Sequence, residues 1–340
     1  MGANRTDRGR AASWNTTTIC SDALRGNALG DPHERTLHVW APEDDTSRRY
    51  PSVYVVQGMT GIADAWFNVE PWTTSYPDRI DELALDAVVV LVDAFTAVGG
   101  SQYIDSPGIG NYHTYLCDEV VPYVDAHFPT RTDGPYRGIQ GKSSGGYGSM
   151  ITPLLRPDLF GALATHAGDA LFEVAYARDF APAARALREA YDGSFDAFWE
   201  DFRSGRSILS GPHDELLVNT YAMCAAYSSN EDGTVDIPFD IETGERIPEI
   251  WERWLRYDPV LLARRPEHAA TLRNMRAIWI DSGVSDEYHL DLGALAFHRE
   301  VVAAGTPAEN VHLELFKGSH RGLSWRYPLS LAFLVERLAA

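Results

Sequence analysis

The sequence predicts an α/β fold, in which a mainly parallel sheet is flanked by helices and a helical insertion separates two late strands. Two observations predict it. Short apolar runs alternate with loops and helix-like segments from residue 52 to residue 166, and again after residue 277. This alternation is typical of parallel sheets covered by helices. Between the two regions the alternation lapses, and the chain becomes helix-rich and aromatic.

The N-terminal region predicts a short leader followed by two strands. Residues 1–13 are rich in Arg, Ala and Gly and have little to bury, so we expect a disordered leader. Residues 16–21 and 35–40 alternate apolar and polar side chains. That pattern favours strands that are solvated on one face.

The next segments predict the centre of the sheet. Residues 52–57 and 87–93 are almost continuously apolar and β-branched, as in strands buried on both faces. A helix is expected near residues 76–85. The Gly-rich loop 94–111 is long, and loops of that length in compact domains are usually functional. Residues 112–128 carry apolar side chains at helical spacing.

The remaining segments complete two parts of one core. A strand is expected at residues 136–140, a helix at 144–155 that Pro153 should kink, a strand at 162–166 and, after the insertion, alternating strands and helices. The predicted core is therefore 14–170 together with 275–340, and the insertion is 171–274. The later elements are expected at 277–281, 290–304, 311–316 and 328–338.

Composition excludes several classes of protein. The net charge of -19 and the pI near 4.9 disfavour nucleic acid and anionic membranes as partners. No apolar run approaches the roughly 18 residues of a membrane span. Three widely spaced cysteines indicate neither a disulfide framework nor a zinc site. No secretory signal is visible, so we expect a cytoplasmic protein without metal or cofactor.

The pattern Gly-x-Ser-x-Gly at Gly141, Ser143 and Gly145 follows a predicted strand and precedes a predicted helix. It is typical of a nucleophile elbow, a tight turn that exposes a serine, and its glycines allow close backbone packing. Ser143 is the predicted nucleophile. Ser144, one residue away from the centre of the pattern, is the rival.

A serine nucleophile needs a histidine base and an orienting acid, which follow it in the order Ser, acid, His in this architecture. Four of the eleven histidines lie beyond strand 277–281, and only His320 lies on a loop directly after the last strand. His320 is therefore the predicted base. The other three histidines are His289, His298 and His312.

The acid is expected on the loop after residue 281. Asp286 follows the turn at Gly283 and is the predicted partner of His320, although it could also cap the next helix. Asp281 could cap the turn instead. Asp169, which follows strand 162–166, is the runner-up acid.

Acyl transfer also needs donors for the oxyanion. The backbone N–H of Ser144 follows the nucleophile directly, and Met59 lies in the loop Gly58-Met59-Thr60-Gly61 after an earlier strand. We predict these two N–H groups as the oxyanion hole. The alternative for the loop is that its glycines only form a tight turn.

Several motifs together resemble the esterase group of α/β-hydrolases that includes esterase D (S-formylglutathione hydrolase), enterochelin esterases and feruloyl esterases, with mycolyl transferases as relatives. The resemblance covers most of the chain outside the insertion. It implies an α/β-hydrolase fold and a serine esterase whose triad falls on Ser143, Asp286 and His320. The matching segments are 50–58, 112–124, 144–148 with 156–161, 283–286 and 318–320.

The resemblance predicts hydrolysis of a small-molecule carboxylic ester or thioester through an acyl-enzyme. An acyltransferase with the same triad, and a non-catalytic binding protein of the same fold, are the alternatives. The chain departs from the family where His or Asp commonly precedes the oxyanion-loop glycine, since Gln57 stands there. It departs again where Met commonly follows the nucleophile, since Ser144 stands there.

The insertion could be a cap over the active site, a unit whose aromatic residues only form its own core, or a homodimer surface. Its segment 230–236 faintly resembles a calcium loop without the full ligand spacing, so a surface turn is favoured. Gln57, His166 and Trp325 are candidates for lining the substrate pocket. For His166 and Trp325, packing is the equal alternative.

Overall fold

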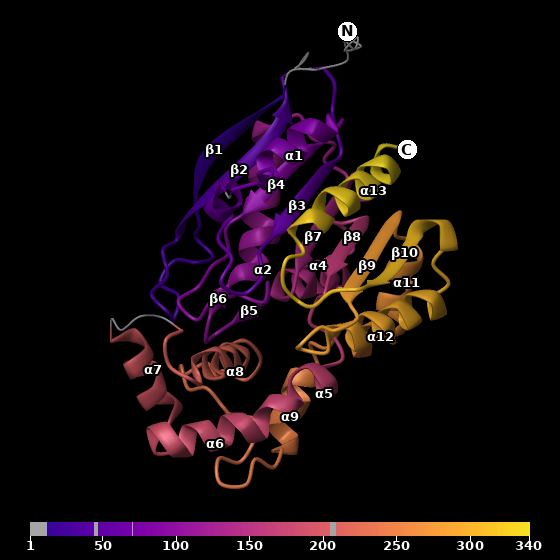
Figure 1. The fold of residues 1–340 in the computed structure, drawn as a ribbon. Helices are drawn as coiled ribbons and strands as arrows, with labels where there is room; N and C mark the ends of the chain where they lie inside the picture. The colour runs from indigo at the N-terminus through magenta and orange to yellow at the C-terminus, as the bar shows by residue number, and fades with distance from the viewer. Residues whose placement is uncertain (1–11, 44–46, 70, 205–208) are drawn as a thin grey trace.

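The computed structural model describes residues 12–43, 47–69, 71–204 and 209–340, and its centre is an eight-stranded sheet (Figure 1). The strand order is β1-β2-β4-β3-β7-β8-β9-β10. β2 pairs antiparallel with β1 and β4, and every pair from β4 to β10 is parallel. The predicted mainly parallel α/β fold is confirmed. The strands are β1 Ala12–Cys20, β2 Glu34–Pro42, β3 Ser52–Val56, β4 Val88–Val92, β7 Arg137–Lys142, β8 Ala162–His166, β9 Ala277–Gly283 and β10 Val311–Phe316.

Side-chain alternation along the buried strands creates two cores, one on each face of the sheet. Val53 and Val55 of β3 face α1 (Tyr76–Leu83) and α13 (Tyr327–Ala339). Tyr54 and Val56 face the opposite way, toward the second core. Because both faces are covered, β3 and β4 are almost entirely apolar. The second face is covered by α2 (Tyr112–Thr114), α3 (Val121–His127), α4 (Ser144–Leu155) and α12 (Leu290–Ala303).

The N-terminal prediction needs two corrections. The expected leader lies mostly outside the described residues, but Ala12 and Ser13 belong to β1, where they pair with Pro42 and Ala41. β2 is buried along most of its length rather than solvated on one face. The reason is that β2 lies inside the sheet, between β1 and β4, and side chains cover both its faces.

Two further segments differ in detail from their predictions. The expected helix 112–128 contains a π-helical segment at Tyr115–Val120, in which the Val121 N–H bonds to the Leu116 carbonyl five residues earlier. Pro122, which has no N–H, comes directly afterwards. The long loop 94–111 contains a small hairpin made by β5 (Asp105–Ser106) and β6 (Gly110–Asn111).

The helix-rich segment between β8 and β9 divides into two parts. Its first helices form a separate layer beside the sheet, at the bottom of Figure 1 and away from both chain termini. α10 and α11 instead pack against α4, so they belong structurally to the core. The helices are α5 Phe172–Ala175, α6 Phe180–Tyr191, α7 Phe195–Arg203, α8 Asp214–Tyr227, α9 Pro248–Leu255, α10 Pro259–Ala263 and α11 Pro266–Arg273.

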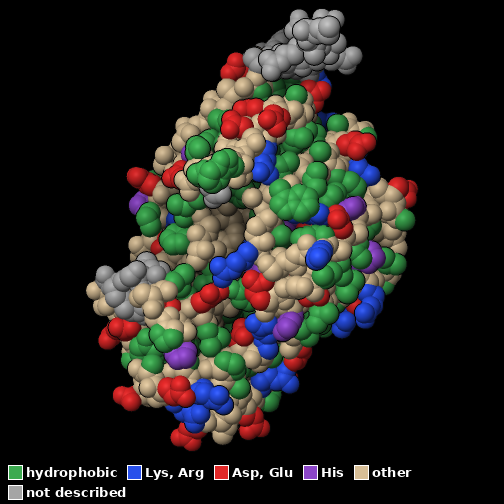
Figure 2. Space-filling view, viewed as in Figure 1, with side chains coloured by type: hydrophobic (Ala, Val, Ile, Leu, Met, Phe, Trp, Pro, Cys, Tyr) green, Lys and Arg blue, Asp and Glu red, His purple; other side chains and the backbone are tan. Residues whose placement is uncertain are grey.

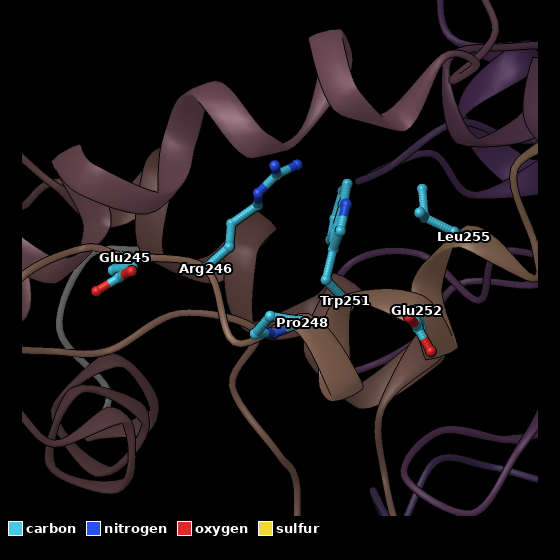
Figure 3. Close-up of a pocket in the computed structure, with 6 residues that line it drawn as sticks. All are labelled: Glu245, Arg246, Pro248, Trp251, Glu252 and Leu255. Carbon is cyan, nitrogen blue, oxygen red and sulfur yellow. The ribbon is translucent and has the colours of Figure 1, made fainter.

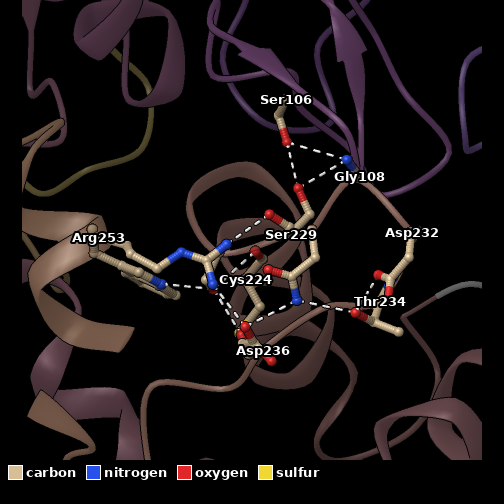
Figure 4. A network of polar contacts seen from close by, with 11 residues as sticks. Ser106, Gly108, Cys224, Ser229, Asp232, Thr234, Asp236 and Arg253 are labelled. Carbon is tan, nitrogen blue, oxygen red and sulfur yellow. Dashed lines mark hydrogen bonds and ion pairs between the residues drawn. The ribbon is translucent and has the colours of Figure 1, made fainter. Parts of the chain in front are cut away.

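Polar contacts tie the insertion to the β5–β6 hairpin (Figure 4). Ser106 Oγ donates to the Ala225 carbonyl at 2.6 Å, and Ser229 Oγ accepts from the Gly108 N–H at 2.9 Å. A side chain at Gly108 would collide with the Ala225 carbonyl, because its Cβ would lie only 2.7 Å from that oxygen. These contacts fix α8 next to the core.

The segment 230–236 is a surface turn. Asp232 Oδ1 accepts hydrogen bonds from the N–H and hydroxyl of Thr234. Asp236 Oδ2 accepts from Asn230 and Arg253 (Figure 4). These carboxylates therefore serve the local turn and the α8–α9 contact. Among the described residues, no cluster of three or more His, Cys, Asp or Glu side chains could hold a metal ion.

Candidate active site

Ser143 lies at a sharp turn between β7 and α4, with φ 56° and ψ -125°. This left-handed backbone conformation is strained for a residue with a side chain. The Ser143 N–H donates to the carbonyls of His166 (3.0 Å) and Ala167 (3.1 Å), which hold the turn against the end of β8. The turn has the geometry of a nucleophile elbow.

Gly141 and Gly145 permit this turn because backbone passes too close for a side chain. A Cβ on Gly145 would lie 2.4 Å from the Val56 carbonyl oxygen, and one on Gly141 would lie 2.4 Å from backbone atoms of Gly145. β3, β7 and the start of α4 are therefore in direct backbone contact.

Asp286 and His320 form a buried pair. His320 Nδ1 lies 2.8 Å from Asp286 Oδ2, and the two residues are 6% and 5% exposed. Asp286 Oδ1 accepts from the backbone N–H groups of Tyr288 (2.9 Å) and Leu290 (3.4 Å). Burial alone would raise the pKa of Asp286, but the hydrogen bond and charge of His320 and these N–H groups outweigh it, so the pKa is lowered. Asp286 is a carboxylate at neutral pH.

The loops that carry this pair are held together by backbone contacts. The Ser285 N–H donates to the Gly318 carbonyl, and the His320 N–H donates to Glu287 Oε2 at 2.8 Å. A Cβ on Gly283 would lie 2.5 Å from the Gly318 carbonyl oxygen, so Gly283 allows the two loops to touch. A glycine is therefore needed at position 283 so that the backbones of the two loops can pack against each other.

The predicted oxyanion donors lie on either side of Gly100. A Cβ at Gly100 would be 3.5 Å from Met59 Cα and 3.7 Å from Ser144 Oγ. Ser144 is the first residue of α4, where N–H groups have no intrahelical partner. For the Met59 N–H, no acceptor is recorded in the part of the chain that the structure describes. The Ser144 side chain is only 2% exposed, which favours Ser143 over Ser144 as nucleophile.

One cavity of about 580 Å³ brings these residues together. Met59, Ser143, Ser144 and His320 line one part of it. The insertion supplies another part, mainly through α8 with Leu216, Val218 and Asn219 and through Leu209 and Pro212. Charged side chains complete the wall, namely Lys142, Asp169, Arg178, Asp179, Glu215 and Arg321.

The aromatic residues of the insertion mostly form its own core. Trp251 and Trp254 pack edge-on against Phe180, and Phe198 contacts Phe195 and Phe202. No described aromatic residue of segment 195–257 lines the cavity. The wall that the insertion contributes comes instead from the segment 175–179, which includes Tyr176, from Leu209 and Pro212, and from the side chains of α8, none of which a sequence motif marks.

A second hollow of about 390 Å³ lies within the insertion (Figure 3). It is lined by residues 245–255, among them Arg246, Trp251 and Leu255. Arg246 and Trp251 both bond to Glu173 there. This hollow includes none of the predicted catalytic residues, so we place the chemistry in the larger cavity.

Two of the predicted pocket residues do not line the cavity. The side chain of Gln57 follows the parity of Val53 and Val55 and points to the α1–α13 face, where its Oε1 accepts from Trp66 Nε1. Trp325 is 46% exposed and stacks edge-on against Phe316. Both residues therefore contact other parts of the protein than the site.

His166 is the third correction, because it is fully buried under α13 and has no access to the cavity. Its Nδ1 lies 2.7 Å from Asp281 Oδ1 and its Nε2 lies 2.9 Å from Ser330 Oγ. Arg326 Nε donates to Asp281 Oδ2 at 2.9 Å. Asp281 thus anchors a buried network rather than a turn, while the His166 backbone supports Ser143.

Replacing Arg326 by Met is expected to destabilise the protein by about 3–5 kcal/mol, because the Asp281 carboxylate would lose a partner inside the protein. Burial opposes ionisation of Asp281, but His166, Trp279 and Arg326 outweigh it and lower its pKa. The stabilisation is therefore present above the ordinary aspartate pKa of about 3.9 and is lost as pH falls through the lower folded value.

Urea unfolding across this pH range measures the effect. Arg337→Met, on the accessible side of helix α13, which begins directly after Arg326, is the matched control, and we expect it to cost under about 1 kcal/mol. Equal losses for the two variants would contradict a role for the buried network.

Comparison with known proteins decides the family. Residues 27–330 match the sequence profile of the family described as "Putative esterase". The chain belongs to this esterase family. The predicted family and enzyme class, a carboxylic ester hydrolase, are confirmed. Curated protein sequences contain no match to the chain.

Solved structures of esterases and serine hydrolases share the α/β-hydrolase fold of this protein. A ferulic acid esterase aligns with 96% of this chain and 98% of its own, at a TM-score of 0.60 and 18% identity. An S-formylglutathione hydrolase from Agrobacterium tumefaciens aligns with 99% and 98%, at 0.56 and 16%. Fluorophosphonate-binding serine hydrolase F from Staphylococcus aureus aligns with 95% and 98%, at 0.58 and 15%.

The surface agrees with the composition of this esterase. Acidic side chains are spread over the face shown in Figure 2 and do not gather in one patch, and basic side chains stand between them. Within the described residues, no helix has both the length and the apolar character needed to cross a membrane.

Proposed function

We propose that this esterase hydrolyses a carboxylic ester or thioester through an acyl-enzyme on Ser143, with His320 as base and Asp286 as the orienting acid. The observation that carries the proposal is the buried 2.8 Å contact between His320 Nδ1 and Asp286, with His320 and Ser143 on the wall of one cavity. Asp169, the runner-up acid, bonds to other residues instead.

The chemistry follows from these positions. Because Asp286 accepts a hydrogen bond from the Nδ1–H of His320, the Nε2 atom of His320 is left unprotonated and can take the proton of Ser143 Oγ as that oxygen attacks the ester carbonyl carbon. The N–H groups of Met59 and Ser144 would stabilise the oxyanion. His320 then returns the proton to the leaving alcohol or thiol as its bond to the carbonyl carbon breaks.

In the second half, His320 takes a proton from water as the water oxygen attacks the acyl carbon of the intermediate. Ser143 leaves with that proton, and the carboxylic acid is released. Asp286 holds the ring in one tautomer and stabilises the imidazolium in both halves. Its lowered pKa keeps it ionised throughout the neutral range.

The insertion acts as a cap in this proposal, because α8 lines the same cavity as Ser143. Because the proteins of similar fold include a ferulic acid esterase and an S-formylglutathione hydrolase, we would test aromatic acyl esters and small thioesters first. A cytoplasmic location and a homodimer remain predictions.

A screen of short-chain and aromatic acyl p-nitrophenyl esters, thioesters and siderophore lactones tests the function. Turnover is expected with free acid as the main product. Transfer is tested in the same assay by adding glycerol or an amine as acceptor. Acyl transfer exceeding hydrolysis would instead favour the acyltransferase, and the absence of turnover would favour a binding protein.

A further inference from the structure

Asp169 is a buried acid on the cavity wall that the proposed mechanism does not use. It follows β8 and is 6% exposed. Its Oδ2 accepts hydrogen bonds from Tyr176 Oη (2.8 Å), Gln102 Nε2 (3.4 Å) and Ser144 Oγ (3.5 Å). Three neighbouring side chains thus orient the carboxylate through a single oxygen.

The other oxygen, Oδ1, is left for a ligand. Among the described residues, none donates a hydrogen bond to Oδ1. This oxygen is also not sealed inside the protein, so a ligand in the cavity can reach it. The exposed part of Asp169 lies on the cavity, together with Tyr176 and Ser144. The free acceptor is therefore presented to whatever occupies the space beside Ser143.

Burying the ionised Asp169 side chain without a cationic partner costs free energy. None of the ion pairs formed among the described residues includes Asp169. Burial raises its pKa, although the hydrogen bonds of Tyr176 and Gln102 and the charge of His320 act in the opposite direction. Buried acids without a cationic partner are rare unless they have a function.

The charges around the cavity select the kind of group that Asp169 can bind. Lys142, Arg178 and Arg321 line the wall together with the carboxylates Asp169, Asp179 and Glu215, so basic and acidic side chains balance and the wall favours an uncharged ligand. A neutral hydroxyl can donate to Oδ1 without adding charge. A hydrogen bond from a neutral donor to an ionised acceptor is stronger than one between neutral groups.

We propose that Asp169, oriented by Tyr176, is a specificity-determining residue that accepts a hydrogen bond from a hydroxyl group of the substrate. This inference rests on the proposed function. Because Asp169 contacts Ser144, the residue directly after Ser143, the hydroxyl would lie near the reacting ester group. It can belong to the acyl part or to the alcohol part.

Two matched ester pairs distinguish these sources. For the acyl side, kcat/KM is compared for the p-nitrophenyl esters of β-hydroxybutyrate and butyrate. For the alcohol side, glyceryl butyrate is compared with propyl butyrate. Each ratio is divided by the ratio of the hydroxide-catalysed rates, which removes intrinsic reactivity. We expect the wild type to prefer the hydroxylated ester of one pair by about 10- to 100-fold.

Asp169→Leu should reduce that preference to near one, and Asp169→Asn, which keeps an acceptor for Tyr176, should reduce it partly. Asp179→Asn, another carboxylate on the cavity wall, is the matched control and should leave the preference within about twofold. A wild-type ratio near one for both pairs, or a preference that survives both Asp169 variants, would overturn the proposal.

Binding to Ser143→Ala gives a measurement that needs no turnover. Calorimetry with β-hydroxybutyrate and butyrate, and with glycerol and propanol, should show tighter binding of the hydroxylated member of one pair. That difference should disappear when Asp169→Leu is added. Equal binding within both pairs would refute the hydroxyl site, whereas hydrolysis that survives Ser143→Ala would refute only the proposed mechanism.

Stability separates a binding role from a structural one. The pKa of Asp169 is higher in the folded than in the unfolded chain, so its ionisation destabilises the fold above that raised value and not below the ordinary aspartate pKa. Asp169→Asn should therefore unfold at higher urea than the wild type at pH 8, with the gain shrinking as pH falls. A variant less stable than the wild type at pH 8 would indicate a structural role and contradict the proposal.

Discussion

Replacing Ser143 by alanine is expected to lower kcat for ester hydrolysis by about 10⁴- to 10⁶-fold, because the variant lacks the oxygen on which we propose that the acyl-enzyme forms. The cavity, His320 and the N–H groups of Met59 and Ser144 would remain, so KM should change little. Steady-state hydrolysis of p-nitrophenyl butyrate measures the effect.

Ser149→Ala is the matched control. Ser149 lies in the same helix α4, is fully buried, and donates only to the Gly145 carbonyl at 2.9 Å. Loss of this local hydrogen bond should change kcat by no more than a few-fold. A Ser143→Ala enzyme that keeps a tenth of the wild-type kcat would show that another residue is the nucleophile.

Replacing Asp286 by asparagine is expected to lower kcat by about 10³- to 10⁴-fold. Asparagine is nearly the same size, but its amide can donate to His320 Nδ1 and so favour the wrong tautomer of the ring. It also removes the negative charge that stabilises the imidazolium. Burst and steady-state kinetics with a p-nitrophenyl ester should show acylation slowed together with deacylation.

Glu287→Gln is the control for Asp286→Asn. Glu287 is the next carboxylate on the same loop, but it accepts from the backbone N–H of His320 and not from the ring. We expect a loss of under about tenfold, since only the loop loses a charged hydrogen bond. Equal losses in the two variants would indicate that the acids only support the loop.

Local patterns in the sequence were sufficient to predict the sheet and the reactive loops. The apolar runs at β3 and β4 mark strands buried on both faces, and Gly141 and Gly145 mark a turn that tolerates no side chain. The positions of Asp286 and His320 follow from the order of strands, because parallel strands place their following loops at one edge of the sheet.

The walls of the cavity could not be predicted in this way. Strand parity would have placed Gln57 on the α1–α13 face, but the faces are known only once the sheet order is known. His166 was expected near the site because it ends β8, and its side chain instead meets Asp281 and Ser330. Contacts between distant segments decide both cases.

The insertion shows the same limit. The aromatic residues of segment 195–257 pack within the insertion, whereas Tyr176 and the aliphatic residues of α8 line the cavity. From the sequence, Asp169 is predicted only as an alternative to Asp286. Its hydrogen bond from Tyr176, just after α5, and its contact with Ser144, at the start of α4, join segments whose proximity the sequence does not reveal.

Labelling with a fluorophosphonate, followed by peptide mapping, tests the central claim most directly. The reagent forms a covalent bond with a serine only when a base activates its oxygen. We predict one adduct per chain, on the peptide containing Ser143, and no adduct in heat-denatured protein or in Ser143→Ala. An adduct on another residue, or equal labelling of Ser143→Ala and the wild type, would contradict the account.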